Sequence, residues 1–380
     1  MNWKLDATGQ ELLRRAESIA EKVVAPAAAE TDKSARFPTD AIAALRSAGL
    51  LGLLSSKEHG GQGQSLRTAV AVVERLAREC PSTAMVVTMH YCAAKVIDKF
   101  GRDIHCRAIA TEGKLGTLAF SEAGSRSHFW IPVSTAEKIA QGIKLNAEKQ
   151  LITSCEHADF YVWSSRPVQK DGLSTIWVVP RDADGLTITA VYDGLGLRGN
   201  GSSSLRARNV VIPETNRLGE DGQGFDIMVN EVLPCFNLLS ASTSLGMMEG
   251  VVAHAVRHVS SARYAHDGTS LADLPQVRAH VAKMRIKTDL LRGLLQDALD
   301  ALEQQREEAP LRVLQAKAAG AELSLEVHDL AMRVCGGAAF RKDLPVERFF
   351  RDSRAANVMA PVTDALYDMI GKSICGLPVF

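Results

Sequence analysis

The hydrophobic and polar positions of this chain change their spacing twice along its length. From about residue 5 to 110, apolar residues recur every three or four positions, as in DAIAALRSAGLLGLL and RTAVAVVERLAREC. This period is that of amphipathic α-helices. A glycine-rich break, KEHGGQGQS at 57–65, predicts a loop between two of these helices.

From about residue 115 to 215 the helical period is replaced by short β-branched or aromatic runs. Examples are FYVWSSRP, LSTIWVVPRD and RARNVVIPE, which are bounded by Gly, Pro, Asp or Asn. Their spacing favours an antiparallel barrel or sandwich. No GxGxxG motif leads from a strand into a helix, so a Rossmann-type dinucleotide site is not expected.

From about residue 224 onward the helical period returns. Amphipathic stretches at 277–306, 314–335 and 362–375 predict helices. The whole pattern predicts an α+β multidomain fold of three parts. These are an N-terminal helical domain at 1–114, a central antiparallel β-barrel or sandwich at 115–222 and a C-terminal helical bundle at 223–380.

Charge and composition exclude several classes of function. Lys and Arg total 44, as do Asp and Glu, so no net field draws the chain to nucleic acid. The N-terminal stretch has no apolar core of signal-peptide length, and no run approaches the length of a membrane span. The seven cysteines form no CxxC pair, which disfavours a zinc site or a disulfide framework. We therefore expect a cytoplasmic protein without a bound metal or a membrane partner.

Six short motifs carry a family resemblance. They are EHGGQG at 58–63, LAFSEAGSRS at 118–127, ITSCEHADFYV at 152–162, GLGLRGNGSSSL at 194–205, LGEDGQGF at 218–225 and RVCGGAAFRKDLPVERFFRD at 333–352. In this order they resemble the acyl-CoA dehydrogenase superfamily over nearly the whole chain. The resemblance implies a flavoprotein oxidoreductase with FAD as cofactor, or FMN as the alternative. It also implies a homotetramer, built as a dimer of dimers with flavin sites at subunit contacts.

The resemblance further implies which residues meet the flavin. Ser121 and Thr153 stand where a hydroxyl or backbone N–H bonds the polar edges of the isoalloxazine; a turn residue and a strand residue are their structural alternatives. The resemblance also implies that Ser127 reaches a phosphate with help from Arg126 or His128; ordinary polarity of an exposed loop is the structural alternative for all three. The glycine pair at 336–337 lets the backbone approach a pyrophosphate, or ends a helix. The implied cofactor-binding residues are Leu118, Phe120, Ser121, Ser127, Leu151, Ile152, Thr153, Arg333, Gly336 and Gly337.

Two departures from the family pattern bear on function. Counting from Arg351 and Asp352, the position of the family's catalytic carboxylate holds Ala360. Some relatives carry the base at the start of the second helical domain, and Phe236 occupies that position. Removal of the α-proton of a thioester requires a positioned base, so the usual chemistry is in question. In addition, Tyr264 stands where the family has an arginine that reaches the FAD tail.

Two other residues are candidates for acid–base chemistry. His90, in STAMVVTMH, lies on an apolar helix that lines the acyl cavity in the family, and a near-neutral pKa would suit proton transfer. Asp364 follows Ala360 by one helical turn and would face the same cavity. Each also has a structural interpretation, as a satisfied core histidine and as a solvated helix residue. Glu122, in the flavin-side turn, is interpreted as structural.

Three functions follow as hypotheses. The first is an FAD-dependent oxidoreductase that acts on an acyl thioester or a similar apolar small molecule with an unusual or relocated base, and passes electrons to an electron-transfer flavoprotein. The second is a reduced-flavin-dependent monooxygenase on the same fold, supplied by a flavin reductase, because STAMVVTMH resembles a segment of such relatives. The third is a flavin- or acyl-binding protein without turnover.

Overall fold

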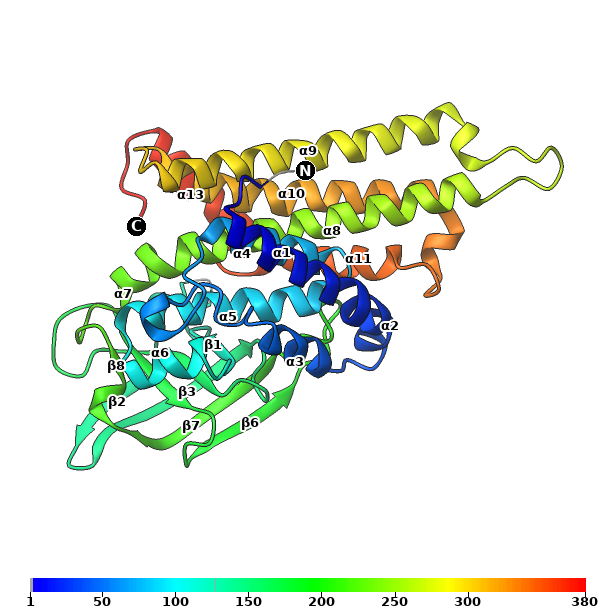
Figure 1. Cartoon of the computed structure of the whole chain (residues 1–380). Coiled ribbons are helices and arrows are strands. Elements are labelled where there is room, and N and C mark those ends of the chain that lie inside the picture. Colours follow the sequence, from blue (N-terminus) through cyan, green and yellow to red (C-terminus); the bar gives the residue numbers. More distant parts are fainter. Residues whose placement is uncertain (1–2, 127) are drawn as a thin grey trace.

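The chain folds into a β layer covered by two layers of helices (Figure 1). The computed structural model describes residues 3–126 and 128–380. The shorter N-terminal helices lie between the strands and the long C-terminal helices α8, α9 and α10, which run side by side. The predicted order of a helical, a β and a second helical region is confirmed.

The helices are α1 (Ala7–Ile19), α2 (Ala25–Lys33), α3 (Thr39–Ser47), α4 (Leu66–Ala77), α5 (Pro81–Phe100), α6 (Asp103–Ala110), α7 (Gly224–Ile227), α8 (Leu233–Ser261), α9 (Pro275–Glu303), α10 (Ala309–Cys335), α11 (Val346–Ser353), α12 (Ala355–Val358) and α13 (Thr363–Ile374). Two π-helical segments, Ala20–Val24 and Met228–Val232, join α1 to α2 and α7 to α8. The three predicted C-terminal helices correspond to α9, α10 and α13. Among the described helices, none combines the length and apolar character that a membrane span needs.

Local sequence explains how these helices begin and how closely they pack. The Asp6 carboxylate caps α1 by accepting a hydrogen bond from Gly9 N at 2.6 Å. Proline stands in the first turn of α5, α8, α9 and α10, where its missing N–H costs nothing. In the buried helix α8, Gly246 lets α4 approach, since a Cβ there would lie 2.3 Å from Glu74 O.

The strands are β1 (Gly116–Ala119), β2 (Thr135–Ile139), β3 (Gly142–Ile152), β4 (Phe160–Ser165), β5 (Thr175–Pro180), β6 (Leu186–Val191), β7 (Ser203–Ile212) and β8 (Arg217–Leu218). They form two four-stranded sheets, in the orders β1-β4-β5-β8 and β2-β3-β7-β6. One pair departs from the predicted antiparallel pattern, because β1 and β4 are parallel. The β2–β3 hairpin lies between them in sequence and provides the long connection that a parallel pair requires.

The strand β4 is buried along its whole length because it is covered on both faces. Tyr161 and Trp163 point into the core between the two sheets, together with Trp177 of β5. On the other face, Phe160 packs in the helical core. A Cβ on Gly116 would lie 2.8 Å from the Phe160 ring and 3.2 Å from Ala93 of α5. Close contact between β1 and α5 therefore sets the position of the segment that follows β1.

Candidate active site

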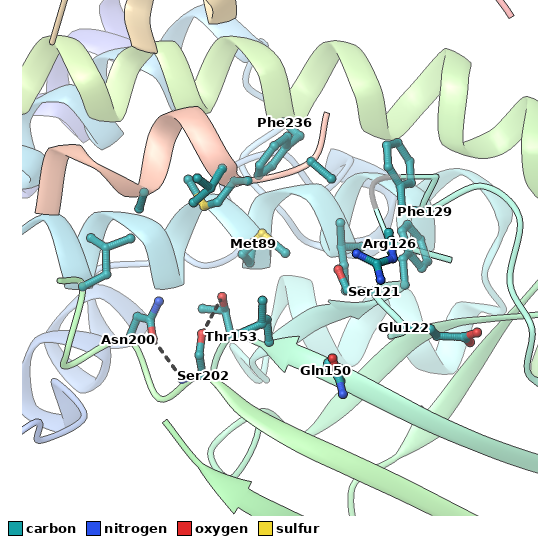
Figure 2. A pocket seen from close by; sticks show the side chains of 18 of the residues that line it. Met89, Ser121, Glu122, Arg126, Phe129, Gln150, Thr153, Asn200, Ser202 and Phe236 are labelled. Carbon is teal, nitrogen blue, oxygen red and sulfur yellow. Dashed lines mark hydrogen bonds between the residues drawn. The ribbon is translucent and has the colours of Figure 1, made fainter. Parts of the chain in front are cut away.

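A cavity of about 540 Å³ lies where β1 and β3 end, against α5, the start of α8 and the segment after α12 (Figure 2). This volume is within the range of cofactor and ligand pockets. The described residues that line it are Met89, Leu118, Phe120, Ser121, Glu122, Ala123, Arg126, Phe129, Gln150, Leu151, Thr153, Tyr192, Leu197, Asn200, Ser202, Val232, Leu233, Phe236, Ala355, Val358, Met359 and Ala360.

The β side of the cavity carries its polar edge. Ser121 O accepts a hydrogen bond from Gln150 N at 2.9 Å, which joins the segment after β1 to the end of β3. The Thr153 hydroxyl lies 3.4 Å from that of Ser202, and Ser202 N donates to Asn200 Oδ1 at 2.9 Å. Hydroxyl and amide groups from three segments distant in sequence are thus brought to one side of the cavity.

An exposed apolar side chain accompanies this polar edge. Leu151 is 66% exposed although it is the second-to-last residue of β3, beside the cavity, and its backbone has a φ of 54°. Leu197, on the opposite loop, has a φ of 50°. Such left-handed conformations are strained for residues with a Cβ and gather at ligand sites. The apolar Leu151 side chain is therefore held exposed at the edge of the cavity.

The helical side of the cavity is apolar. Val232 ends the π-helical segment before α8, and Phe236 follows in the first turn of that helix. Ala360 lines the same wall, between α12 and α13, so neither predicted position for a base contributes an ionisable group. The Ala360 segment is held from behind by Lys317, whose Nζ donates to Met359 O at 3.0 Å and to Pro361 O at 2.6 Å. Burial lowers the pKa of Lys317 to about 7.

Glu122 supplies the carboxylate among the described lining residues, but its oxygens are already engaged. Oε1 accepts from Lys149 Nζ at 2.5 Å. Oε2 accepts from the backbone N–H groups of Val133 at 2.6 Å and Ser134 at 3.1 Å. Burial by itself would raise the pKa of Glu122, but the charge and hydrogen bond of Lys149 outweigh it and hold that pKa below its usual value. The carboxylate is a poor proton acceptor in this arrangement, which agrees with its structural interpretation.

His90 lies outside the cavity, and its neighbour Met89 lines the wall instead. The imidazole is fully buried, with Nε2 donating to Leu51 O at 2.8 Å and Nδ1 accepting from Gly116 N at 3.1 Å. Burial lowers the pKa of His90 to about 4, so the ring is neutral at pH 7. This geometry ties α5 to β1 and to the loop after α3. A catalytic role for His90 stays a prediction that the arrangement does not favour.

Asp364 is exposed in the first turn of α13 and is not among the lining residues. The expectation that it follows Ala360 on a helix was wrong about the local structure. Helix α13 begins at Thr363, and Val362 before it is extended, with ψ at 156°. The i to i+4 relation that would place both side chains on one face therefore does not hold.

Half of the ten residues expected at the cofactor line the cavity. Five of them line the cavity, namely Leu118, Phe120, Ser121, Leu151 and Thr153. Ile152 is buried between the sheets, and Ser127 lies outside the described residues. Arg333, Gly336 and Gly337 are exposed at the end of α10 and do not line the cavity.

Several lining residues were not nominated from the sequence. Asn200 and Ser202 lie in the glycine-rich segment 194–205, whose resemblance to the family was the available signal. Met89 lies in STAMVVTMH, on the helix that the resemblance places at the acyl cavity, but the sequence singled out His90 of that segment instead. Val232 had no signal beyond helical periodicity, which does not tell a cavity wall from a closed core.

Three family models match successive parts of the chain. They describe the N-terminal domain of acyl-CoA dehydrogenase at residues 6–108, the middle domain at 117–210 and the C-terminal domain at 222–375. The human mitochondrial short-chain specific acyl-CoA dehydrogenase is 28% identical over 363 residues, covering 93% of this chain and 87% of that protein. The acryloyl-CoA reductase (NADH) of Anaerotignum propionicum is 26% identical over 377 residues, covering 96% of this chain and 94% of that protein.

Solved structures show the same fold. Butyryl-CoA dehydrogenase from Megasphaera elsdenii superposes with a TM-score of 0.91 at 23% identity, covering 99% of this chain and 100% of that one. PigA, solved with FAD and proline, superposes with a TM-score of 0.88 at 18% identity, covering 99% of each chain. The chain belongs to the acyl-CoA dehydrogenase superfamily, and the expectation of a flavin-dependent oxidoreductase is confirmed at the level of this family.

Proposed function

We propose that the chain binds FAD in the cavity and oxidises an acyl thioester or a similar apolar substrate, without a protein carboxylate at the usual base position. One observation carries this proposal: a polar edge and an exposed leucine on the β side face an apolar wall that contains Ala360. The first part supports a flavin, and the second supports an altered proton-transfer step.

The β side fits an isoalloxazine ring. Ser121 and Thr153 offer hydroxyl and backbone groups to the polar edge of the ring, and Leu151 offers an apolar surface to its face. PigA, which shares the fold, binds FAD. When bound, the flavin would supply a two-electron acceptor. The chain's own residues would orient the ring and exclude water from it.

The apolar wall is suited to an acyl chain rather than to an ion. Phe236, Met359 and Ala360 carry no ionisable group, and the Glu122 carboxylate is engaged by Lys149. No lining carboxylate among the described residues is therefore available as the base that removes the α-proton of an acyl substrate. We expect the ordinary dehydrogenation of saturated acyl-CoA to be slow in the parent protein.

A visible spectrum and an anaerobic titration test this function. The purified protein should be yellow. In a panel of acyl-CoA and acyl-carrier thioesters, saturated substrates should bleach the flavin slowly. Faster bleaching is expected only from thioesters whose α-proton is unusually acidic. A protein that binds no flavin after incubation with FAD would overturn the proposal. Rapid bleaching by a saturated acyl-CoA would contradict its second half.

The same experiment separates the two alternatives. A reduced-flavin-dependent monooxygenase would bind oxidised flavin weakly and form product only with a flavin reductase and oxygen. Its support in the sequence was the segment STAMVVTMH, whose His90 lies outside the cavity. A non-catalytic binding protein would retain the ligand with neither bleaching nor product.

Assembly and electron transfer are part of the proposal. Arg333, Gly336 and Gly337 are exposed and are not among the lining residues, so their expected contact with the cofactor tail would be made to a cofactor held by a second copy of the chain. We propose a homotetramer that passes electrons to an electron-transfer flavoprotein; one structural neighbour is described as an electron transferring flavoprotein of Acidaminococcus fermentans. Light scattering of the purified protein tests the assembly, and a monomer that binds FAD with full affinity would contradict it.

A further inference from the structure

A buried ammonium group lies behind the helical wall of the cavity. The Lys317 side chain extends from α10, is 1% exposed and donates to Met359 O at 3.0 Å and to Pro361 O at 2.6 Å. These carbonyl groups belong to the residues on either side of Ala360, which lines the cavity. The Lys317 Nζ also lies 6.0 Å from the centre of the Phe236 ring, which lines the same wall. The positive charge is therefore close to both positions at which the family resemblance places a base.

The charge of Lys317 has no compensating carboxylate among the described residues. Burial alone lowers the pKa of this side chain, and no titratable neighbour contributes to that change. Glu322, further along α10, accepts a hydrogen bond from Asn357 Nδ2 at 3.2 Å, and Asp364 is exposed in the first turn of α13. A buried charge is screened much less than a surface charge, so the field of Lys317 extends into the cavity.

A ligand beside Ala360 would meet a wall that is apolar at its surface and positively charged behind it. Figure 2 shows Phe236 and Thr153 on opposite sides of the cavity, so a molecule held between them lies against this wall. On the β side, the Glu122 carboxylate is paired with Lys149 and does not offset the charge. Such a wall favours a neutral acyl group that becomes negatively charged at this point during the reaction.

We propose that Lys317, acting through this wall, makes the α-proton of a bound acyl thioester more acidic by stabilising the enolate that forms when the proton leaves. This inference rests on the proposed function. The C–H electron pair moves into the bond between the α-carbon and the carbonyl carbon, the negative charge collects on the carbonyl oxygen, and the proton passes to water or a buffer base. Lys317 does not line the cavity, so it is a positioning residue and not the proton acceptor. A charge that folding has already fixed needs no rearrangement when the enolate develops.

Titration of a bound 3-oxoacyl-CoA tests this proposal without turnover. The α-proton of this probe is flanked by two carbonyl groups, and its enolate is followed by its ultraviolet absorbance at saturating ligand. We expect the pKa of the bound probe to be higher in Lys317→Met than in the parent by about one pH unit or more, which is about a tenfold loss of acidity. Lys317→Arg keeps a positive charge and should recover part of this difference.

A surface lysine provides the matched control. Lys372 of α13 pairs with Asp368 at 2.8 Å and is not among the lining residues. Lys372→Met also removes one positive charge, but water and salt screen that charge, so the pKa of the bound probe should stay within about 0.3 unit of the parent value. A purely structural role of Lys317 would lower stability and leave the pKa of the saturated probe unchanged.

The outcomes separate this inference from the proposed function. Equal probe pKa values in the parent and in Lys317→Met, or an equal shift in Lys372→Met, would overturn the role of Lys317. A parent that binds the probe but no flavin refutes the flavin part of the proposed function, and the titration still decides the role of Lys317. A parent that binds flavin but not the probe overturns both the thioester substrate and this inference.

Discussion

Two buried lysines lie behind different walls of the cavity, Lys149 behind the β side and Lys317 behind the helical side, and they are held in different ways. Lys149 of β3 and Lys317 of α10 are each 1% exposed. Lys149 has the Glu122 carboxylate at 2.5 Å, whereas Lys317 donates to backbone carbonyl oxygens and, among the described residues, has no carboxylate partner. Burial lowers the pKa of Lys149 to about 8 even though Glu122 acts against this, and burial lowers the pKa of Lys317 to about 7.

The difference teaches how each wall is kept in place. On the β side, opposite charges compensate each other and anchor the turn that carries Ser121 and Arg126. On the helical side, the Lys317 ammonium group donates hydrogen bonds to the carbonyl oxygens of Met359 and Pro361, on either side of Ala360. Because the pKa of Lys317 is about 7, its charge changes with pH near neutrality. The anchor on the β side is thus an ion pair, whereas the anchor behind Ala360 is a buried cation that hydrogen-bonds to carbonyl oxygens.

The largest expected effect comes from removing the partner of Lys149. Glu122→Ala leaves an ammonium ion buried without a counter-charge, which costs about 3–5 kcal/mol of unfolding free energy. Denaturant unfolding followed by circular dichroism measures this loss. The double variant Glu122→Leu/Lys149→Met removes both charges and should recover most of the stability. A single variant within about 1 kcal/mol of the parent would contradict the anchoring role.

A smaller loss is expected at His90, a buried titratable group that belongs to neither wall. His90→Ala removes hydrogen bonds to Leu51 and Gly116 and leaves a void, at a cost of about 2–4 kcal/mol. The rate of flavin reduction per folded molecule should change by less than about threefold, since a general acid or base contributes about 10²-fold or more. A fall of that size with unchanged stability would restore the catalytic hypothesis.

The smallest expected effect is that of Lys317→Met. The Met359 and Pro361 carbonyls lose their donor, which costs about 1–3 kcal/mol, and removal of a buried charge offsets part of this. Thermal unfolding should therefore show a modest loss at neutral pH.

The pH dependence identifies the cause of that loss. The pKa of Lys317 is about 7 in the folded state and 10.5 in the unfolded chain, so between these values the unfolded state holds the extra proton. The contribution of Lys317 to stability therefore rises as pH increases from 7 to 10.5. The difference in unfolding free energy between parent and Lys317→Met should grow in that window. A difference independent of pH would mean that Lys317 has an ordinary pKa when folded.

The sequence was sufficient to predict features that depend on residues close together along the chain. Periodicity predicted α9, α10 and α13, and the spacing from Arg351 and Asp352 led to Ala360, which lines the cavity. The predicted position of Asp364 was wrong because the helix was assumed to continue through 360–362. In the structure, Val362 has an extended backbone and α13 begins only at Thr363.

Features that depend on distant contacts were not accessible from the sequence. The bonds of His90 to Leu51 and Gly116 are made across three separate segments. Lys149 and Lys317 are of a residue type that is rarely buried, so neither was expected inside the protein. The parallel pairing of β1 with β4 also depends on a connection that strand patterns do not specify.

Restoring a carboxylate at position 360 tests the central claim most directly. In Ala360→Glu, with Ala360→Gln as the uncharged control of the same size, anaerobic flavin reduction by a saturated acyl-CoA is followed at the visible flavin band. The account predicts that the glutamate variant reduces its flavin about 10²–10⁴-fold faster than the parent, and that the glutamine variant does not. Equal rates in all three proteins, with flavin bound in each, would contradict it.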